Sequence, residues 1–155
     1  MSAKKKHWNQ HDWLHERLVI GAKESIFFPD LELQVAAKVD TGARTSSLHA
    51  EKITPFVKQN RTWVRFLTQG SSDNEGQMHR VELPVYDRRE VRSSNGQLSE
   101  RYVVRLWMEL GSIKQKIEVT LADRSQMKYP MLLGRKALEE HFLVAPGASY
   151  LLSHC

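Results

Sequence analysis

The sequence predicts a mainly β, closed or barrel-like domain with one short helix near its C-terminal end. Residues 113–121 alternate apolar and polar side chains, which is the period of two expected of a half-buried strand. Gly111-Ser112 joins this segment to the apolar residues that begin at Val103, and glycine at the first turn position suits a type II′ hairpin. The other apolar runs are only two or three residues long, which is the length of strand segments.

Four further strands are predicted along the chain. Each carries apolar or β-branched residues and is bounded by polar or turn-forming ones; they are residues 17–20, 33–39, 62–67 and 79–86. Residues 69–77 are rich in serine, aspartate, asparagine, glycine and glutamate, which indicates a solvated loop between two of these strands.

A second hairpin is predicted around Ser93-Ser94-Asn95-Gly96, because Asn-Gly is a favoured turn dipeptide. Its flanks, residues 88–92 and 97–101, contain few apolar side chains. With so little to bury, this hairpin is expected to project into solvent.

One helix is predicted over residues 135–141. It follows Gly134 and ends before Pro146, and Ala137, Leu138 and Phe142 would form its apolar face.

The length of 155 residues fits a single domain, expected over residues 17–155. A composition of 41% hydrophobic and 26% charged residues is that of a globular protein. No run approaches the ~18 apolar residues of a membrane helix, so no membrane partner is expected. The polar beginning of the chain and the single cysteine, Cys155, favour a reducing, cytoplasmic setting.

Residues 1–16 are expected to form a flexible basic arm. Lys4, Lys5 and Lys6 supply three of the five net positive charges of the chain. His7, His11 and His15 recur every four residues, so a helix would align them as metal ligands, but a polar arm without ligands is the preferred interpretation. The net positive charge of the chain favours acidic partners. A nucleic-acid partner is not expected, because no base-reading motif accompanies the charge.

The most informative segment is Asp40-Thr41-Gly42-Ala43, which follows an apolar strand. Glycine permits a tight turn, so this order of residues can present an acidic side chain at the end of a rigid strand. An isolated Asp-Thr-Gly is also an ordinary turn sequence.

A second segment, Met131-Leu132-Leu133-Gly134-Arg135, lies about ninety residues later and leads into the predicted helix. Together the two segments resemble the retropepsin-like aspartic proteases. The run from Ala37 to Ala50 is similar to a bacterial branch of that group that has been labelled "ATP-dependent zinc protease". The resemblance covers residues 18–152.

The resemblance implies a catalytic role for Asp40. In this chemistry two adjacent carboxylates share one proton, because like charges so close cannot both ionise at low cost. One takes a proton from water while the other protonates the scissile carbonyl. The chain has one Asp-Thr-Gly, and its other aspartates lack this context, so a two-fold homodimer with one Asp40 from each copy is implied.

The resemblance also assigns supporting roles. Thr41 would interlock the two active-site loops, Gly42 would admit the substrate backbone, and Ala43 completes the loop. Leu132, Leu133 and Gly134 would form the strand and turn beneath the site, with plain core packing as the other interpretation of the leucines. The hairpin at Asn95-Gly96 would be the flap that closes over a peptide. The apolar segment 150–152 is expected to join the dimer interface.

One departure from the family pattern concerns Arg135. Viral relatives often carry an acidic residue just after the Asp-Thr-Gly-Ala loop, and it balances the arginine after Leu-Leu-Gly. Here Arg44 follows Ala43, so Arg135 is expected to have a different partner.

The bacterial branch is associated with a ligase that adds glutamates to a ribosomal protein, which implies an acidic, glutamate-rich peptide substrate. Arginines can grip carboxylates bidentately, and five would line or rim the cleft, unless they are solvated surface charge: Arg44, Arg88, Arg89, Arg92 and Arg101. Ser46 and His49 are further candidates for substrate binding, as are the flap residues Asn95 and Gly96.

No metal and no cofactor are expected. The chain contains neither a His-Glu-x-x-His zinc motif nor a Gly-x-x-x-x-Gly-Lys-Ser/Thr phosphate loop. No motif in the sequence therefore supports the words zinc and ATP in the label of the bacterial branch. Two other functions stay open at this point. One is a peptide-binding module without catalysis on the same fold, and the other is a basic ribosome- or RNA-binding β domain.

Overall fold

The computed structural model describes residues 17–70, 77–92 and 95–153. The predicted basic arm 1–16 with its histidines, most of the predicted loop 69–77, and Ser93-Ser94 of the flap turn lie outside the described residues. The mainly β prediction is confirmed, with 60% of the described residues in strands and 3% in helix. No helix in the described ranges is long and apolar enough to cross a membrane.

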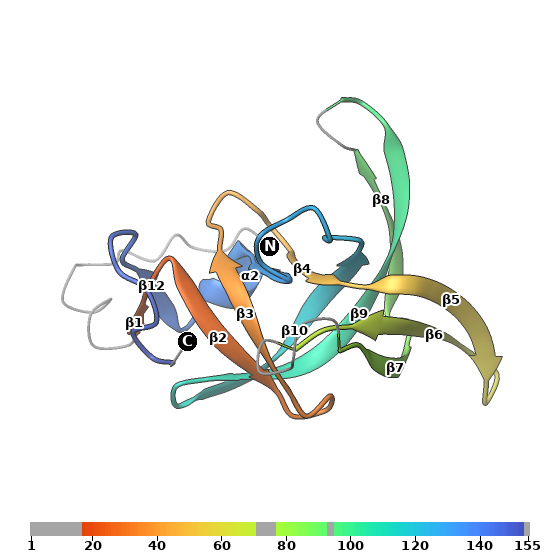
Figure 1. Cartoon of the computed structure of the whole chain (residues 1–155), viewed down its shortest axis with the longest axis horizontal. Helices are drawn as coiled ribbons and strands as arrows, with labels where there is room; N and C mark the ends of the chain where they lie inside the picture. Colours follow the sequence, from red (N-terminus) through yellow and green to blue (C-terminus); the bar gives the residue numbers. More distant parts are fainter. Residues whose placement is uncertain (1–16, 71–76, 93–94, 154–155) are drawn as a thin grey trace, which may run out of the picture.

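Six strands form a closed barrel (Figure 1). Their order around the barrel is β10-β4-β11-β3-β2-β9, and β9 pairs with β10 to close the ring. The strands are β2 (Lys23–Phe28), β3 (Leu33–Val39), β4 (Ser46–His49), β9 (Leu98–Leu110), β10 (Ile113–Ala122) and β11 (Met131–Leu133).

The predicted hairpin at Gly111-Ser112 is confirmed. Ile113 pairs with Leu110 across a two-residue turn, and of the two turn residues only Gly111 has a positive φ, of 58°. That is the pattern of a type II′ turn. The predicted alternation is confirmed for Ile117, Glu118 and Val119, since Ile117 and Val119 are buried and Glu118 is not. It is wrong at Thr120, which is buried between Val119 and Leu121 and whose hydroxyl donates to the carbonyl of Ser46 at 3.2 Å.

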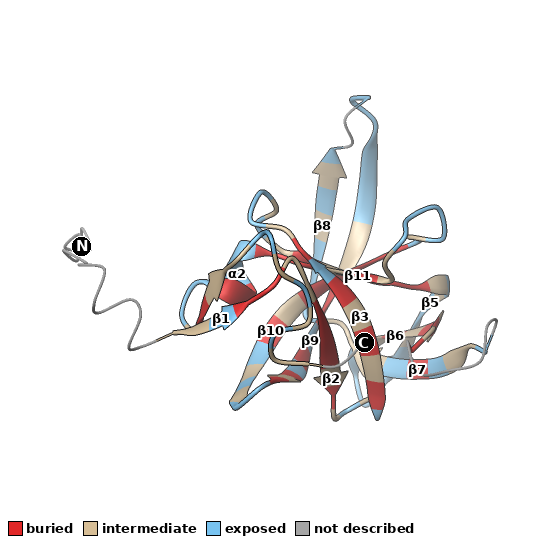
Figure 2. Cartoon of the chain, turned by 60° about the vertical axis from the view of Figure 1, so that its left-hand side comes forward, coloured by how far each residue is buried: buried red, intermediate tan, exposed pale blue. Residues whose placement is uncertain are grey.

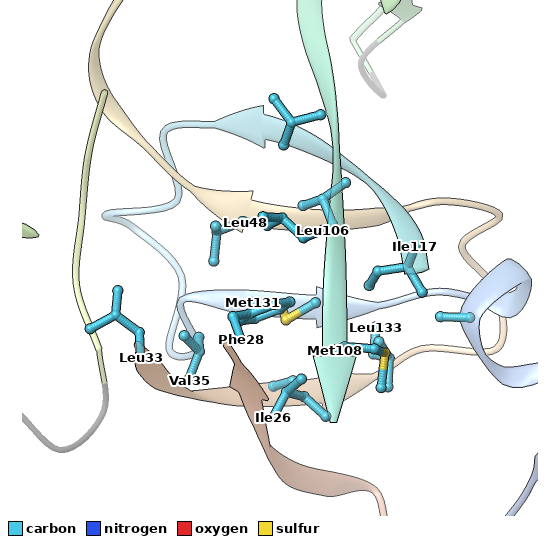
Figure 3. Packing of buried hydrophobic residues seen from close by; sticks show 14 of the residues in the cluster. Ile26, Phe28, Leu33, Val35, Leu48, Leu106, Met108, Ile117, Met131 and Leu133 are labelled. Carbon is cyan, nitrogen blue, oxygen red and sulfur yellow. The ribbon is translucent and has the colours of Figure 1, made fainter. Parts of the chain in front are cut away.

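The barrel is filled by the inward-facing side chains of all six strands (Figure 3). Burying these apolar groups is the main favourable term in forming the fold. Met131 and Leu133 on the short strand β11 are fully buried among residues from β2, β4 and β9, including Ile26, Leu48 and Met108. The strand that precedes Gly134 is therefore fixed by core packing.

Two smaller sheets flank the barrel. β5 (Glu51–Lys58), β6 (Arg61–Thr68) and β7 (His79–Pro84) form a three-stranded antiparallel sheet. β1 (Leu18–Ile20) pairs in parallel with β12 (Phe142–Val144). The strands predicted at 17–20, 62–67 and 79–86 are thus present with slightly different ends.

The predicted helix over 135–141 is wrong in its extent. The helix α2 covers only Arg135–Leu138, and Phe142 belongs to strand β12. The backbone N–H of Leu18 donates to the carbonyl of His141, and Leu18 pairs with Phe142, so β1 supplies strand partners where a longer helix would continue. Phe142 is buried, as expected, but from a strand.

The predicted flap projects from the barrel (Figure 2). β8 (Asp87–Arg92) pairs with the beginning of β9, from Arg92 with Leu98 to Asp87 with Val103. At its tip Gly96 has a φ of 83°, and the N–H of Gln97 donates to the side-chain oxygen of Asn95. Most residues of β8 are exposed, as the few apolar side chains predicted.

Candidate active site

Asp40 stands at the end of β3, in a loop tied to the end of β11. Its backbone N–H donates to the carbonyl of Leu133 at 2.9 Å, and the N–H of Gly42 donates to its Oδ1 at 2.8 Å. The side chain is half-buried, while Thr41 and Gly42 are exposed. One carboxylate oxygen is therefore fixed, and Oδ2 accepts no hydrogen bond from the described residues.

Gly134 is required by a close approach of two backbones. A Cβ at this position would lie 2.8 Å from the carbonyl carbon of Thr45 and 3.0 Å from the carbonyl oxygen of Ala43. The N–H of Gly134 donates to Ser46 Oγ at 3.0 Å. The two segments of the family motif thus lie against each other, with no room for a side chain between them.

The start of α2 holds the loop that follows Asp40. The backbone N–H groups of Arg135 and Lys136 donate to the carbonyls of Ala43 and Arg44, at 2.8 and 3.1 Å. The first N–H groups of a helix have no partner within the helix, so this loop satisfies them. The different partner expected for Arg135 is the carbonyl of Thr41, to which its Nη1 donates at 3.0 Å.

Several predicted residues lie beneath the loop. Leu133 is fully buried and Leu132 half-buried, in accord with core packing. Ser46, a candidate for substrate binding, is buried and accepts the Gly134 hydrogen bond. The structure thus places Ser46 in support of the loop.

The arginines around the flap differ in their partners. Arg89 is bound to carboxylates of its own chain, with Nε 2.9 Å from Asp87 and Nη2 3.2 Å from Glu118. Arg88 likewise contacts Glu100 at 2.6 Å. By contrast, Arg44 and Arg92 are exposed, and neither has an ion pair within the described residues.

Glu118 connects the base of the flap to α2. Its Oε2 lies 3.2 Å from Arg89 Nη2 and 3.3 Å from Lys136 Nζ. Burial opposes the ionisation of Glu118, but these two cations outweigh it and hold the pKa of the carboxyl below its ordinary value. The hydrogen bond from Arg89 likewise lowers the pKa of Asp87.

His49 is 6% exposed at the end of β4 and lies between two carboxylates. Its Nε2 is 3.2 Å from Glu51, and its Nδ1 accepts the backbone N–H of Arg124 at 2.8 Å. Asp123 lies 3.8 Å from Nδ1, and its oxygen accepts two hydrogen bonds from Ser125. The three side chains could reach a common metal ion. However, a ligand at Nδ1 would have to displace the Arg124 N–H, so the contacts favour a structural His49.

The sequence does not single out Arg124, a half-buried arginine near His49. It follows β10, its side chain is half-buried, and no carboxylate among the described residues pairs with it. Nothing in its local sequence distinguishes it from a surface charge, because its surroundings come from His49 and Tyr129 and from the flap strand β9.

Comparison with known proteins agrees with this geometry. Residues 19–154 match the family described as "Retropepsin-like aspartic endopeptidase RimB". The crystal structure of a Legionella pneumophila protein of unknown function superposes with a TM-score of 0.74 at 29% identity, covering 86% of this chain and 97% of that one.

The chain is also 40% identical over 137 residues to a Shewanella halifaxensis protein named "Probable alpha-L-glutamate ligase", and 39% identical to one of the same name from Parasynechococcus marenigrum. Each match covers 88% of this chain but only 30% and 29% of the relative, so the chain spans less than a third of their length. The family match covers nearly all the described residues and includes the Asp40 loop and Gly134. The chain therefore belongs to the family of retropepsin-like aspartic endopeptidases described as RimB.

Proposed function

We propose that the protein is a homodimeric aspartic endopeptidase that cleaves acidic, glutamate-rich peptides. The observation that carries the proposal is the position of Asp40. Its backbone and one carboxylate oxygen are held by hydrogen bonds and its other oxygen accepts none from the described residues. Asp40 also lies within the match to a family of aspartic endopeptidases.

The chemistry requires a second carboxylate beside Asp40. The other aspartates of the described ranges are hydrogen-bonded elsewhere: Asp30 accepts from Trp107, Asp87 from Arg89 and Asp123 from Ser125. A second copy related by a two-fold axis would bring its own Asp40 to the site.

In such a dimer the ionised carboxylate removes a proton from water as the water oxygen bonds to the peptide carbonyl carbon. The protonated carboxyl gives its proton to the carbonyl oxygen. The tetrahedral intermediate, a gem-diol, then breaks its C–N bond. The leaving nitrogen takes the proton that the first carboxylate received from water, and one hydroxyl of the gem-diol returns a proton to the second carboxylate.

An apolar groove beside the Asp40 loop supports the dimer. It has a volume of about 420 Å³ and is lined by Thr41 and Arg135 and by residues of α2 and β12, among them Leu138, Phe142 and Leu143. A second copy whose loop meets this one across a two-fold axis would cover it. The segment 150–152 is expected at the same interface. Only part of it is buried by its own chain, since Leu152 packs against the core while Leu151 is 48% exposed.

Two observations support an acidic substrate. The curated relatives carry the name of a glutamate ligase, and a peptidase unit within such a chain would meet the glutamate peptides that a ligase of this kind makes. Arg44 and Arg92 are exposed without ion pairs among the described residues, and both are free to pair with substrate carboxylates.

A single cysteine suits a cytoplasmic site of action.

The test compares cleavage of an α-linked glutamate peptide with that of a matched glutamine peptide, by wild type and Asp40→Asn. We expect preference for the acidic peptide, weakening as salt rises because exposed pairs are screened within about 8 Å at physiological ionic strength. Asp40→Asn should abolish cleavage, and chelators should not. Activity that survives Asp40→Asn but is lost to chelation and restored by zinc would exclude the aspartic mechanism. Binding without cleavage would indicate a peptide-binding module instead.

A further inference from the structure

A cavity of about 290 Å³ lies at the base of the flap, and the Asp40 loop does not contribute to its described lining. It is bounded by the residue before β8, by β9 and β10, and by α2; among its lining residues are Tyr86, Arg105, Gln115, Lys116, Glu118 and Lys136. The volume is just below the ~300–1,000 Å³ of pockets that enclose small molecules, so the cavity fits one or two side chains of a docked segment. Three of the lining residues are cations, and Glu118 is the one acid among them.

The carboxylate of Glu118 is already occupied by other cations. Its Oε2 lies 3.2 Å from Arg89 Nη2 and 3.3 Å from Lys136 Nζ. Arg105 lies directly across the ladder from Glu118 but forms no ion pair with it. Arg105 and Lys116 are both exposed, and neither has an ion pair in the described part of the chain. Two of the three cations in the lining are therefore left without a counter-ion there.

Each of these two cations lies over an aromatic ring. Arg105 Cζ is 5.0 Å from the ring centre of Tyr86, and Lys116 Nζ is 5.9 Å from that of Trp107. The two aromatic residues are 47% and 40% exposed, so the cations stay accessible from solvent. A cation is attracted to the negative face of a ring, which restricts the positions of an otherwise flexible side chain. Both charges are thus partly ordered before a ligand binds, and less ordering remains to be done on binding.

The register of β9 and β10 sets the spacing of the two cations. Arg105 pairs with Glu118 and Lys116 pairs with Trp107, so Arg105 and Lys116 are diagonal neighbours on one face of the ladder. Diagonal neighbours of an antiparallel pair are about 7–8 Å apart. In an extended peptide, side chains two residues apart lie on the same side and are separated by about 6.6 Å. Carboxylates at alternate positions of an extended segment therefore match the two cations.

From these contacts we infer that the cavity docks an extended, glutamate-rich polypeptide segment, with two carboxylates against Arg105 and Lys116. The choice of glutamate rests on the proposed function, whereas the choice of a carboxylate rests on the charges of the lining. The guanidinium can bind a carboxylate through two parallel hydrogen bonds. Carboxylates fit better than nucleobases, because both rings already carry a cation that a stacked base would have to displace. This contact is additional to those that the proposed function gives to Arg44 and Arg92.

Binding is measured in the Asp40→Asn background, so that it does not depend on hydrolysis. The probe is α-linked hexaglutamate with an acetylated N-terminus and an amidated C-terminus. Arg105→Gln and Lys116→Gln should each weaken its binding about 3-fold, and together about 10-fold, as expected for two partly exposed ion pairs.

The matched control is the double variant Lys58→Gln with Arg61→Gln. It also removes one lysine and one arginine that are exposed and face each other across a ladder, but neither lines the cavity. It should weaken binding by about 2-fold at most. All four side chains are exposed, so both double variants should unfold at the temperature of the parent protein. Equal loss of binding in the two double variants would reduce the effect to net charge and would overturn the docking site.

NMR titration with hexaglutamate locates the contact. The backbone amide signals of Arg105 and Lys116 and the indole N–H signal of Trp107 should shift as the peptide binds. Shifts confined to the Asp40 loop and the inner face of the flap would overturn the docking site. Binding of single-stranded oligouridylate that depends on Arg105 and is tighter than that of hexaglutamate would overturn it too.

The docking site and the proposed hydrolysis can fail separately. If wild type cleaves no peptide but the expected losses of binding are found, the docking site stands and the hydrolysis fails. If wild type cleaves glutamate peptides but Arg105→Gln with Lys116→Gln binds hexaglutamate as tightly as the parent protein, the hydrolysis stands and the docking site is overturned.

Discussion

The guanidinium of Arg135 donates a hydrogen bond of 3.0 Å to the backbone carbonyl of Thr41, the residue next to Asp40. A backbone carbonyl thus accepts the bond that a carboxylate often accepts in viral relatives. Arg44 therefore stands at the position of that acidic residue without leaving Arg135 unpartnered. Arg135, at the start of α2, thus braces the Asp40 loop directly.

Arg135→Ala should therefore impair catalysis more than folding. Loss of this bond frees the Thr41 carbonyl and lets the Asp40 loop shift, and small misplacements of a reacting group are costly. We expect kcat to fall roughly 10-fold or more. Peptide cleavage and thermal unfolding measure the two effects, with Arg61→Ala as the control for a lost exposed arginine. An unchanged kcat would show that the brace is dispensable.

Gly134→Ala should destabilise the protein and disturb the site together. The added methyl would meet backbone atoms of Thr45 at 2.8 and 2.9 Å, and backbone cannot move aside as a flexible side chain can. We expect a loss of about 1–3 kcal/mol in the free energy of unfolding. Gly147→Ala is the matched control, because nothing lies within 4 Å of its added methyl. Similar unfolding midpoints for the two variants would contradict the close approach.

Glu24 fastens the C-terminal segment to β2. This fully buried carboxylate accepts the N–H groups of Gly21, Leu151 and Leu152 and the hydroxyl of Ser153. Burial opposes its ionisation, but these donors outweigh burial and hold the pKa of Glu24 below its ordinary value of 4.5. Because the pKa is lower in the folded state, ionised Glu24 stabilises the fold fully above the ordinary value of 4.5. This stabilisation is lost as the pH falls through the folded-state pKa.

Glu24→Gln should release residues 150–153 at neutral pH and cost roughly 2–3 kcal/mol in the free energy of unfolding, since hydrogen bonds to a charged acceptor are strong. Wild type should lose the same stabilisation on acidification below about pH 4.5. Urea unfolding at several pH values, with the exposed Glu90→Gln as the control, measures both. If Glu24→Gln and wild type differ as much at pH 2 as at pH 7, the ionised carboxylate is not what holds the segment.

Glu118→Gln should loosen the flap. Its carboxylate oxygen binds Arg89 at the base of the flap and Lys136 on α2, and an amide oxygen binds cations less strongly. KM should rise about 3- to 10-fold with a smaller change in kcat, because an unanchored flap has more freedom to lose on closing over substrate. Glu109→Gln, which breaks a Glu–Lys pair near the hairpin turn at Gly111, serves as the control. A fall in kcat alone would place Glu118 in another role.

Those parts of the structure that depend on local pattern could be predicted from the sequence. The alternation of residues 113–121, glycine at 111, and the Asn95-Gly96 turn each specify one local geometry. β2 was missed because Glu24 interrupts its apolar pattern, and the reason for Glu24 lies 127 residues away at Leu151.

The candidate site divides in the same way. Asp40 and Gly134 were found because the two segments that contain them together resemble the motifs of a known family, and the close backbone approach at Gly134 gives the physical reason for glycine there. The contact of Arg124 with His49 and the bracing role of Ser46 were not, because the partners lie more than 70 residues away in the sequence. The helix was placed correctly at its start by Gly134, but its end was set by β1, a partner that residues 139–141 do not reveal.

The central claim is that each active site takes one Asp40 from each of two copies, and mixing tests it most directly. Wild type is mixed with an equal amount of Asp40→Asn, and the chains are allowed to exchange before peptide cleavage is measured. If both copies must contribute a carboxylate, only wild-type pairs are active, and the activity per wild-type chain should fall to about half. Activity per wild-type chain that is unchanged by the added Asp40→Asn would show that each chain acts alone and would contradict the shared dyad.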